Sequence, residues 1–281
     1  MVLRRWEVVL RLATSGRHIV EAATGKPLLL RGVNISGMEY SHLPYAGMNP
    51  DELKLVVEGW NCDIVRIPFV QSRVASSEYV DELRQIVKWL WDLGSFAILD
   101  LQWLTPESGV PPEPDLGSID CWDTLARSFD DQPHVIFDLL NEPHDIPVPQ
   151  WLEWAYLLSE TVRAVDPQRV VMVGGLDWAY DLRGVKLDLP NVIYSTHVYP
   201  NKGNKWDECF GNLAREVPVF AGEFGGWDED LVWGEKLMDY FDERQMSWTA
   251  WSWRDKPHLQ GTKFGEIVKA RLGVTSSSHP A

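Results

Sequence analysis

The stretch VIFDLLNEPH, residues 135–144, decides how this chain folds. It begins with a nearly continuous apolar run, which is typical of a strand buried on both faces of a parallel sheet. It ends on polar residues, among them Asn141, Glu142 and His144. Parallel α/β folds carry their functional groups at the carboxyl ends of such strands. The stretch therefore predicts both a fold type and the place of a site.

Seven further runs have the same apolar composition, rich in β-branched or aromatic residues. They are LLLRGVN (28–34), CDIVRIPF (62–69), FAILDL (96–101), RVVMVGG (169–175), NVIYSTHVY (191–199), VPVFAGEF (217–224) and SWTAWSW (247–253). We expect only a turn or short helix at 176–190. Helical patterns fill the other intervals, at 51–60, 77–93, 119–129, 150–165, 204–215, 229–244 and 262–272. Eight buried strands alternating with helices predict an α/β fold of the (β/α)8 TIM-barrel type. The alternative, a doubly wound sheet, lacks a Gly-rich phosphate turn here.

The length of the chain fits one such barrel, because 281 residues compares with about 250 for a typical barrel domain. We expect a single catalytic domain over residues 1–281. Within it, an N-terminal β-hairpin is predicted at about 6–27 and the barrel at about 28–272. A C-terminal tail is predicted at 273–281.

The composition limits the possible partners. The net charge of −15 argues against nucleic acid and anionic membranes, because both reward a basic surface. No stretch approaches the ~20 apolar residues of a membrane span. The 15 tryptophans have two interpretations, a core rich in aromatic rings or a cleft in which flat rings stack on sugars.

Two carboxylates lie at the carboxyl ends of the fourth and seventh runs, Glu142 and Glu223. In a closed barrel these two strand ends face each other across the mouth, which permits a separation of ~5 Å around a glycosidic bond. One carboxyl must then hold a proton for the leaving oxygen while the other is ionised and attacks the anomeric carbon. Arg66 and Tyr199 are expected to keep Glu223 ionised, and apolar surroundings to keep Glu142 protonated.

The chain resembles family 5 glycoside hydrolases, the cellulase family, over residues 17–272. The motifs that carry the resemblance are LRGVN (30–34), IVRIPF (64–69), FDLLNEPH (137–144), STHVYP (195–200), AGEFGG (221–226) and AWSWRDK (250–256). Because six motifs occur in the family's order and spacing, the resemblance is specific. It implies a retaining β-glycosidase on a TIM barrel.

The resemblance also implies roles for the residues within these motifs. Glu142 is similar to the family's acid/base and Glu223 to its nucleophile. Asn141 would bond the 2-hydroxyl of the sugar, Arg66 would support Glu223, and His197 would lie near the acid/base.

Three further positions match family motifs around the substrate. Tyr199 would donate to the nucleophile. Trp251 would floor the subsite in which the sugar is distorted, and Lys256 would bind glucan hydroxyls. Trp253 is the alternative platform if the strand register slips by two residues.

One residue departs from the family pattern. Gln102 follows the third strand where the family usually has histidine, and glutamine can donate and accept hydrogen bonds but cannot titrate. We expect activity with an altered subsite preference or pH profile. Glu39 and Tyr40, in a loop after the first strand, and Trp103, after the third, are interpreted equally well as cleft contacts or as packing residues.

Cleavage of β-1,4-glucan by an endoglucanase is the function that these features favour. The same mechanism on β-mannan, β-1,3-glucan or a β-glucoside is the alternative, because substrate choice depends on loops. A carbohydrate-binding barrel with impaired catalysis is more remote. No metal or other cofactor is expected, because residues 32–40 hold no His-x-His motif.

The expected partner is a β-linked polysaccharide or oligosaccharide, and we expect a monomer. A polymeric substrate favours secretion. The opening residues 1–16, however, contain no uninterrupted apolar run of the kind that a signal peptide has. The compartment therefore stays open between the cytoplasm and the outside of the cell.

Overall fold

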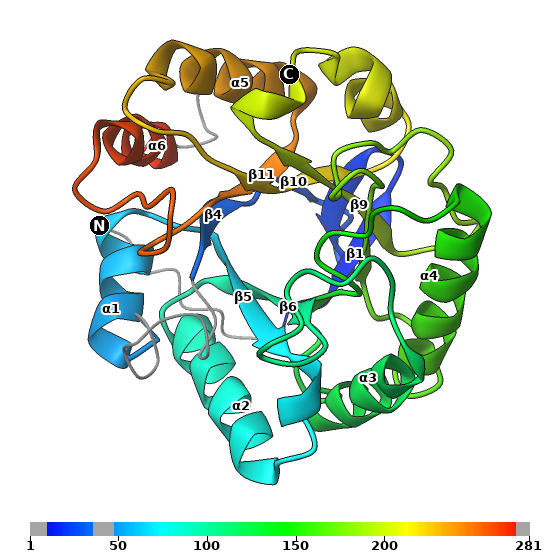
Figure 1. Ribbon diagram of the computed structural model, residues 1–281. Helices are drawn as coiled ribbons and strands as arrows, with labels where there is room; N and C mark the ends of the chain where they lie inside the picture. The colour runs from blue at the N-terminus through cyan, green and yellow to red at the C-terminus, as the bar shows by residue number, and fades with distance from the viewer. Residues whose placement is uncertain (1–9, 36–47, 274–281) are drawn as a thin grey trace.

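The computed structural model describes residues 10–35 and 48–273. Eight parallel strands close into a barrel, each pairing with the next along the chain and the last with the first (Figure 1). They are β4 (Arg31–Asn34), β5 (Ile64–Val70), β6 (Phe96–Trp103), β7 (Val135–Asp138), β8 (Val171–Gly174), β9 (Val192–Val198), β10 (Val219–Phe224) and β11 (Ser247–Ala250). Each predicted apolar run coincides with one of these strands, although β5 and β6 extend one and two residues beyond their runs. The prediction of a (β/α)8 barrel is confirmed.

A ring of α-helices surrounds the barrel (Figure 1). They are α1 (Pro50–Lys54), α2 (Ser77–Asp92), α3 (Leu116–Ser128), α4 (Val148–Arg163), α5 (Leu231–Arg244) and α6 (Lys263–Leu272). The start of α3 shows how sequence fixes a boundary. Asp115 accepts a hydrogen bond from the backbone of Ser118, whose hydroxyl in turn accepts one from the backbone N–H of Asp115. This reciprocal capping box satisfies two N–H groups that a helix start leaves without partners.

Two predicted helices differ from regular α-helices. The pattern at 51–60 forms α1 and then a π-helical turn, Leu55–Gly59. The pattern at 204–215 forms a π-helical turn, Asp207–Gly211, and a 3-10 turn, Leu213–Arg215. Further 3-10 turns span Gln71–Arg73 and Pro200–Lys202. The interval 176–190 holds no helix, as expected.

The predicted N-terminal hairpin is part of a three-stranded antiparallel sheet. Its strands are β1 (Leu12–Ser15), β2 (His18–Glu21) and β3 (Pro27–Leu28). Leu28 pairs within this sheet, so the first barrel strand begins at Arg31 and not at residue 28. Leu12 and Ile19 join the apolar cluster inside the barrel. The sheet therefore covers the amino-terminal end of the barrel.

The inward side chains of the barrel change from apolar to polar along the strands. The apolar layer contains Ile64, Phe96, Ile98, Ile136, Met172, Ile193 and Phe220. Because side chains alternate along a strand, Arg66 faces inward two positions after Ile64, and Asp138 does so two positions after Ile136. Both are fully buried. The carboxyl-terminal half of the interior is thus a layer of polar groups above an apolar floor.

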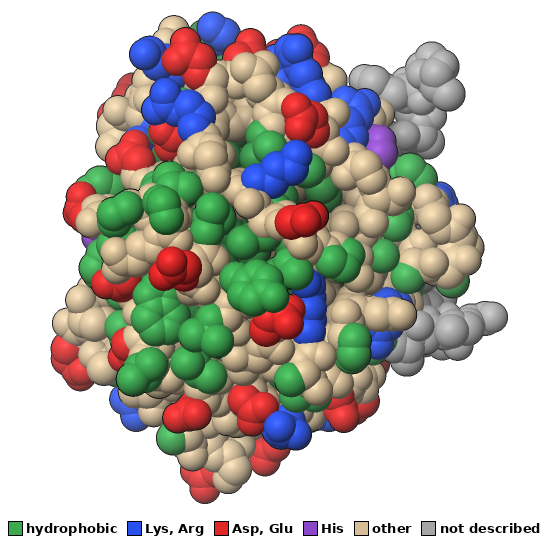
Figure 2. Space-filling model, turned by 90° about the vertical axis from the view of Figure 1, so that its right-hand side faces the viewer, with side chains coloured by type: hydrophobic (Ala, Val, Ile, Leu, Met, Phe, Trp, Pro, Cys, Tyr) green, Lys and Arg blue, Asp and Glu red, His purple; other side chains and the backbone are tan. Residues whose placement is uncertain are grey.

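The outer surface mixes charged and apolar side chains. On the face that bears α4, Lys and Arg side chains are interspersed with Asp and Glu (Figure 2). Apolar side chains also gather on that face, and on α4 itself Tyr156 and Leu157 are exposed. Among the described residues, no helix combines the length and apolarity that a bilayer crossing requires.

Candidate active site

Glu223 reaches the interior because β10 contains an irregularity. Phe220 faces the apolar floor, so strict alternation would point Glu223 outward. The pairing with β9 shifts register between Ala221 and Glu223, which brings Glu223 opposite His197. Phe224 then packs outside the barrel against the helices. A β-bulge that turns a side chain toward a site is a frequent device in functional sheets.

The Glu223 carboxylate is buried and accepts hydrogen bonds at both oxygens. Arg66 Nη1 donates to Oε1 at 2.9 Å, and the Tyr199 hydroxyl donates to Oε2 at 2.8 Å. Burial and the neighbouring Glu223 charge raise the pKa of Tyr199 well above its ordinary value, so it stays a donor. Hydrogen bonds from a cation and a hydroxyl favour the charged form of a carboxyl group.

The surroundings of Glu142 have the opposite effect. Glu142 follows β7, and its Oε1 lies 2.9 Å from His197 Nδ1. Burial raises the pKa of Glu142 to about 7, although Arg66, Lys202 and His144 oppose the shift. Burial also lowers the pKa of His197 to about 3, so this ring is neutral and adds no positive charge beside Glu142.

Arg66 connects the nearby polar side chains. Besides Glu223, its guanidinium donates to Asn34 Oδ1 at 3.0 Å, to Asn141 Oδ1 at 2.9 Å and to Asp138 Oδ2 at 3.0 Å. Asp100 Oδ1 lies 2.9 Å from Nη2. The sequence motifs indicated Arg66 and Asn141, whereas Asp100 and Asp138, within strands, were interpreted as structural hydrogen-bonding groups and not as catalysts. Each lies two residues after an inward-facing isoleucine, Ile98 or Ile136, and this spacing was the available signal for an inward position.

Glu142, His197 and Glu223 also have the composition of a metal site. One ligand-type atom from each lies within 4.8 Å of the others, and no other such group occurs within residues 10–35 and 48–273. Two observations oppose a cation here. The Arg66 charge lies 2.9 Å from Glu223, and the His197 nitrogen nearest Glu142 already pairs with it. The arrangement fits a paired-carboxylate site better than a metal centre.

A hollow of about 630 Å³ opens beside Glu142. Two tryptophans that the sequence analysis did not select line it, Trp178 and Trp227, with 38% and 48% of their surface exposed. Lys202 and Tyr199 also line it, whereas Glu223 and Trp251 do not. The described lining of this hollow includes Glu142 but not Glu223, so the hollow lies on the Glu142 side of the carboxyl pair.

Trp178 is held in place by its neighbours. His144 stacks on its ring at 4.5 Å, and Lys202 Nζ lies 4.9 Å from the ring centre. The backbone is left-handed at three successive residues, Asp177, Trp178 and Ala179. Such conformations are unfavourable for non-glycine residues and often occur at functional sites. No periodic pattern in the sequence indicates this loop, so it could not be selected beforehand.

The eighth strand leads to three residues predicted to bind substrate. Trp251 is 4% exposed and donates from Nε1 to the backbone carbonyl of Lys256, and the Lys256 side chain is exposed. Trp253 is fully buried, donates to Glu52 and packs edge-on against Trp60. The structure therefore contradicts the alternative of Trp253 as a sugar platform, because its ring is buried against Trp60 and Glu52.

The remaining predicted contacts lie at or beyond the third strand. Gln102 is buried, on the inward side of β6 two positions after Asp100, and its Oε1 has no hydrogen-bond partner among the described residues. Trp103 is the last residue of β6 and is partly buried. Glu39 and Tyr40 lie outside the described residues.

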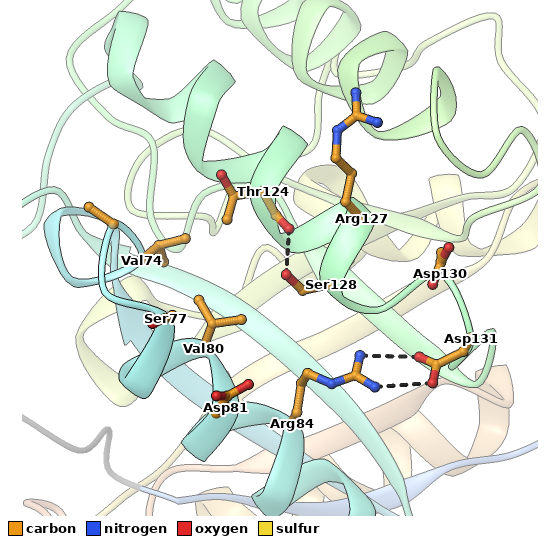
Figure 3. Close-up of a pocket in the computed structure, with 11 residues that line it drawn as sticks. Val74, Ser77, Val80, Asp81, Arg84, Thr124, Arg127, Ser128, Asp130 and Asp131 are labelled. Atoms are coloured by element: carbon orange, nitrogen blue, oxygen red, sulfur yellow. Dashed lines mark hydrogen bonds and ion pairs between the residues drawn. The ribbon is translucent and has the colours of Figure 1, made fainter.

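A second hollow, of about 550 Å³, lies on the outside of the barrel between α2 and α3 (Figure 3). Some of its polar groups are already engaged with one another. Arg84 pairs with Asp131 through two contacts, and the Ser128 hydroxyl bonds the backbone of Thr124. Its described lining contains no aromatic ring and so offers no stacking surface to a sugar.

The barrel and its facing carboxylates define a class of protein, the barrel glycoside hydrolases with a paired-carboxylate site. A family model described as cellulase, glycosyl hydrolase family 5, matches residues 22–257. The chain therefore belongs to glycosyl hydrolase family 5, as the sequence motifs indicated.

Relatives with known names agree with this membership. The chain is 26% identical to Endoglucanase A of Evansella cellulosilytica over 250 residues, which is 81% of this chain and 49% of that protein. It is 28% identical to Endoglucanase A of Butyrivibrio fibrisolvens, covering 82% and 56%. The chain thus spans about half the length of these relatives.

Solved structures share the fold. The β-glucanase SdGluc5_26A of Saccharophagus degradans, in complex with cellotetraose, superposes with a TM-score of 0.83 at 20% identity. The match covers 97% of this chain and 95% of that one. The catalytic domain of endoglucanase Cel5A of Thermobifida fusca gives a TM-score of 0.79 at 18% identity, with 94% and 97% covered.

Proposed function

We propose that the protein is a retaining β-glycosidase in which Glu142 is the acid/base and Glu223 the nucleophile. The observation that carries this proposal is the closeness of the two carboxyl groups, whose oxygens approach within 4.8 Å. Inverting enzymes need roughly 6.5–9.5 Å between their carboxyl groups to admit a water molecule, whereas retaining enzymes need only about 5 Å. The distance supports direct attack by Glu223.

The reaction proceeds in two displacements. Glu223 forms a bond to the anomeric carbon as the bond from that carbon to the leaving oxygen breaks, and Glu142 gives its proton to that oxygen. Glu142, now ionised, takes a proton from water. The water oxygen bonds the anomeric carbon and releases Glu223. Arg66 and Tyr199 stabilise the Glu223 carboxylate before the first step and after the second.

Asn141 and His197 orient the reacting groups. The Asn141 carbonyl oxygen is occupied by Arg66, so its amide nitrogen is the group left for a sugar hydroxyl. A bond from this nitrogen to the 2-hydroxyl would strengthen in the transition state. His197, which bonds Glu142 Oε1, holds the acid/base in position.

A β-1,4-glucan is the substrate that we propose, cleaved within the chain. The names of the endoglucanase relatives support this choice, and so does the hollow with exposed Trp178 and Trp227. Indole rings stack on the flat apolar faces of β-linked sugars. β-Mannan, β-1,3-glucan or a β-glucoside is the alternative. Such a polymer would be met outside the cell.

Azide rescue tests the assignment of the nucleophile. Glu223→Ala should lose ~10³-fold or more in activity because no glycosyl–enzyme bond can form. Added azide should then enter the vacated space and release a glycosyl azide of inverted anomeric configuration. The measurement is product analysis by NMR on an aryl β-cellobioside. Rescue by azide of Glu142→Ala, with inverted product, and not of Glu223→Ala would reverse the two roles.

A product profile tests the choice of polymer. Carboxymethylcellulose, barley glucan, laminarin and mannan would be incubated with the same enzyme preparation. A rapid fall in viscosity of carboxymethylcellulose, with cello-oligosaccharides as products, is expected for cleavage within a β-1,4-glucan. Faster cleavage of mannan or laminarin would assign the protein to the alternative substrate.

A further inference from the structure

Arg66 is surrounded by two buried carboxyl groups that take no part in the proposed bond changes. Asp138 on β7 and Asp100 on β6 both face the barrel interior and are fully buried. The two strands pair side by side, and Asp100 stands opposite Asp138. A buried carboxylate is costly unless it serves a partner. Both contact the guanidinium that holds Glu223, so their effect on that guanidinium is the relevant question.

The two carboxyl groups contact Arg66 differently. Asp138 Oδ2 accepts a hydrogen bond from Nε at 3.0 Å and lies 2.9 Å from Nη2, so one oxygen spans a whole edge of the guanidinium. Asp100 reaches Nη2 alone, at 2.9 Å, and neither of its oxygens has an aligned hydrogen bond to any described residue. Asp138 therefore fixes the rotation of the guanidinium plane, and Asp100 does not.

The opposite side of the same guanidinium serves the reacting groups. With the Nε edge held by Asp138, Nη1 points to Glu223 and Nη2 also reaches Asn141. The guanidinium is planar, so its five donors keep fixed directions relative to one another. Fixing one edge thus fixes the donors to both the proposed nucleophile and the proposed 2-hydroxyl ligand.

We propose that Asp138 is a positioning residue of the catalytic centre, which acts through Arg66 to orient both Glu223 and Asn141. This inference rests on the proposed role of Glu223. Asp138 touches neither the substrate nor the acid/base in this arrangement.

The pKa shifts of the two aspartates also differ. Burial raises the pKa of Asp138 to about 6, although Arg66 lowers it, so Asp138 is charged above neutral pH. Burial raises the pKa of Asp100 well above its ordinary value, although Arg66 opposes the shift. Burial lowers the pKa of Arg66, but the carboxyl groups of Asp100, Asp138 and Glu223 raise it above its ordinary value.

Asp138→Asn tests the proposal through kinetics on an aryl β-cellobioside across the pH range. We expect kcat to fall ~10–100-fold, the size associated with misplaced reacting groups, with KM changed by less than ~3-fold. Removing a negative charge alone would move the acidic limb of the pH–rate profile to lower pH. Loss of the oriented guanidinium from Glu223 should move it to higher pH, so the direction separates the two effects.

Two further variants complete the design. Asp166→Asn removes a buried carboxylate that pairs with Arg169 and Arg11 at the other end of the barrel. It should lower stability and leave kcat and the acidic limb unchanged. Asp100→Asn, an amide of the same shape at a carboxyl that reaches only Nη2 of Arg66, should change kcat less than Asp138→Asn does. A native kcat and acidic limb in Asp138→Asn, or an equal loss in Asp100→Asn, would overturn the proposal.

Arginine side-chain NMR on the native protein tests the contact without any variant. The Arg66 Nε–H, buried and bonded to Asp138, should give a separate ¹⁵N signal that exchanges slowly with water at pH 8. A freely exchanging Nε–H would contradict the proposal even if Asp138→Asn failed to fold. This spectrum requires no turnover, so it tests the contact between Asp138 and Arg66 by itself. The activity of the native enzyme tests the proposed function separately.

Discussion

At the scale of single residues, the two catalytic candidates differ in what surrounds them. Glu223 accepts from Arg66 and Tyr199. Glu142 meets a neutral His197, and burial raises its pKa to about 7. Proximity and different protonation states are the two requirements of the double-displacement mechanism. The closeness of the two carboxyl groups and the raised pKa of Glu142 fit these requirements.

Glu142→Gln should remove one limb of the pH–rate profile. In the native enzyme, activity on unactivated β-glucan should fall as pH rises through about 7, because the acid loses its proton. The variant should lose most of that activity at every pH, and it should still form the glycosyl–enzyme from a substrate with a good leaving group. The check is kcat/KM against pH, with the exposed Glu153→Gln as control.

The same substitution should change stability with a defined sign. A carboxyl whose folded-state pKa is raised binds more protons folded than unfolded between pH 4.5 and about 7. The free energy of unfolding therefore falls as pH rises through that window. Glu142→Gln should remove this loss. The variant should therefore have a free energy of unfolding about 2–3 kcal/mol above that of the native protein at pH 8 and little changed at pH 4. Melting curves at the two pH values measure this difference. An equal gain in stability at both would contradict the raised pKa of Glu142 as its cause.

Gln102 is the residue at which this site departs from its family. It is buried and inward-facing, and its Oε1 has no hydrogen-bond partner among the described residues. Gln102→His would add a group that titrates near neutral pH. We expect either the pH–rate profile or the preference between gluco- and mannosides to change. If both stay unchanged when measured side by side, the departure has no effect on catalysis.

At the scale of elements, the path of β10 matters more than its composition. The register shift in this strand turns Glu223 inward, and Gly222 lies within the shift. A β-carbon at Gly222 would meet Ser195 Oγ at 2.4 Å and His197 Nε2 at 2.9 Å. His197 cannot move freely, because its other ring nitrogen pairs with Glu142. Because Gly222 has no side chain, the space beside it is free for the His197 ring.

Gly222→Ala should therefore impair both stability and catalysis. We expect a loss of about 1–3 kcal/mol from overpacking and a fall in kcat of ~10-fold or more as His197 and Glu142 move. Gly273→Ala is the matched control, since a β-carbon there meets atoms only at ordinary contact distance. The measurements are melting temperature and kcat. Native kcat in Gly222→Ala would show that the space is not needed.

The elements also show what the sequence could predict. Apolar runs identified all eight strands because a strand buried on both faces needs continuous apolar composition. The pattern at 204–215 predicted a helix but forms π-helical and 3-10 turns, which differ from an α-helix in hydrogen-bond register. A short apolar pattern does not fix that register. The shift in β10 was not predicted, although Gly222, an isolated glycine inside a strand run, is a signal that can indicate a bulge.

At the scale of the whole molecule, barrel closure brings distant motifs together. The site combines Arg66 from β5, Glu142 from the segment after β7, His197 from β9 and Glu223 from β10. The sequence predicted that they meet, because strand ends converge in a barrel. Trp178, Trp227 and Lys202 were missed because loop conformation is set by local contacts and not by a repeating pattern. The catalytic pair was thus easier to predict than the hollow beside it.

The most direct test of the paired-carboxylate mechanism is the anomeric configuration of the first product. A β-gluco-oligosaccharide would be hydrolysed in D₂O and the anomeric protons followed by NMR before mutarotation. The two carboxyl groups approach within 4.8 Å, a distance that favours double displacement. The β anomer should therefore appear first and the α anomer only with the mutarotation rate. Initial release of the α anomer would contradict the mechanism and the roles of Glu142 and Glu223.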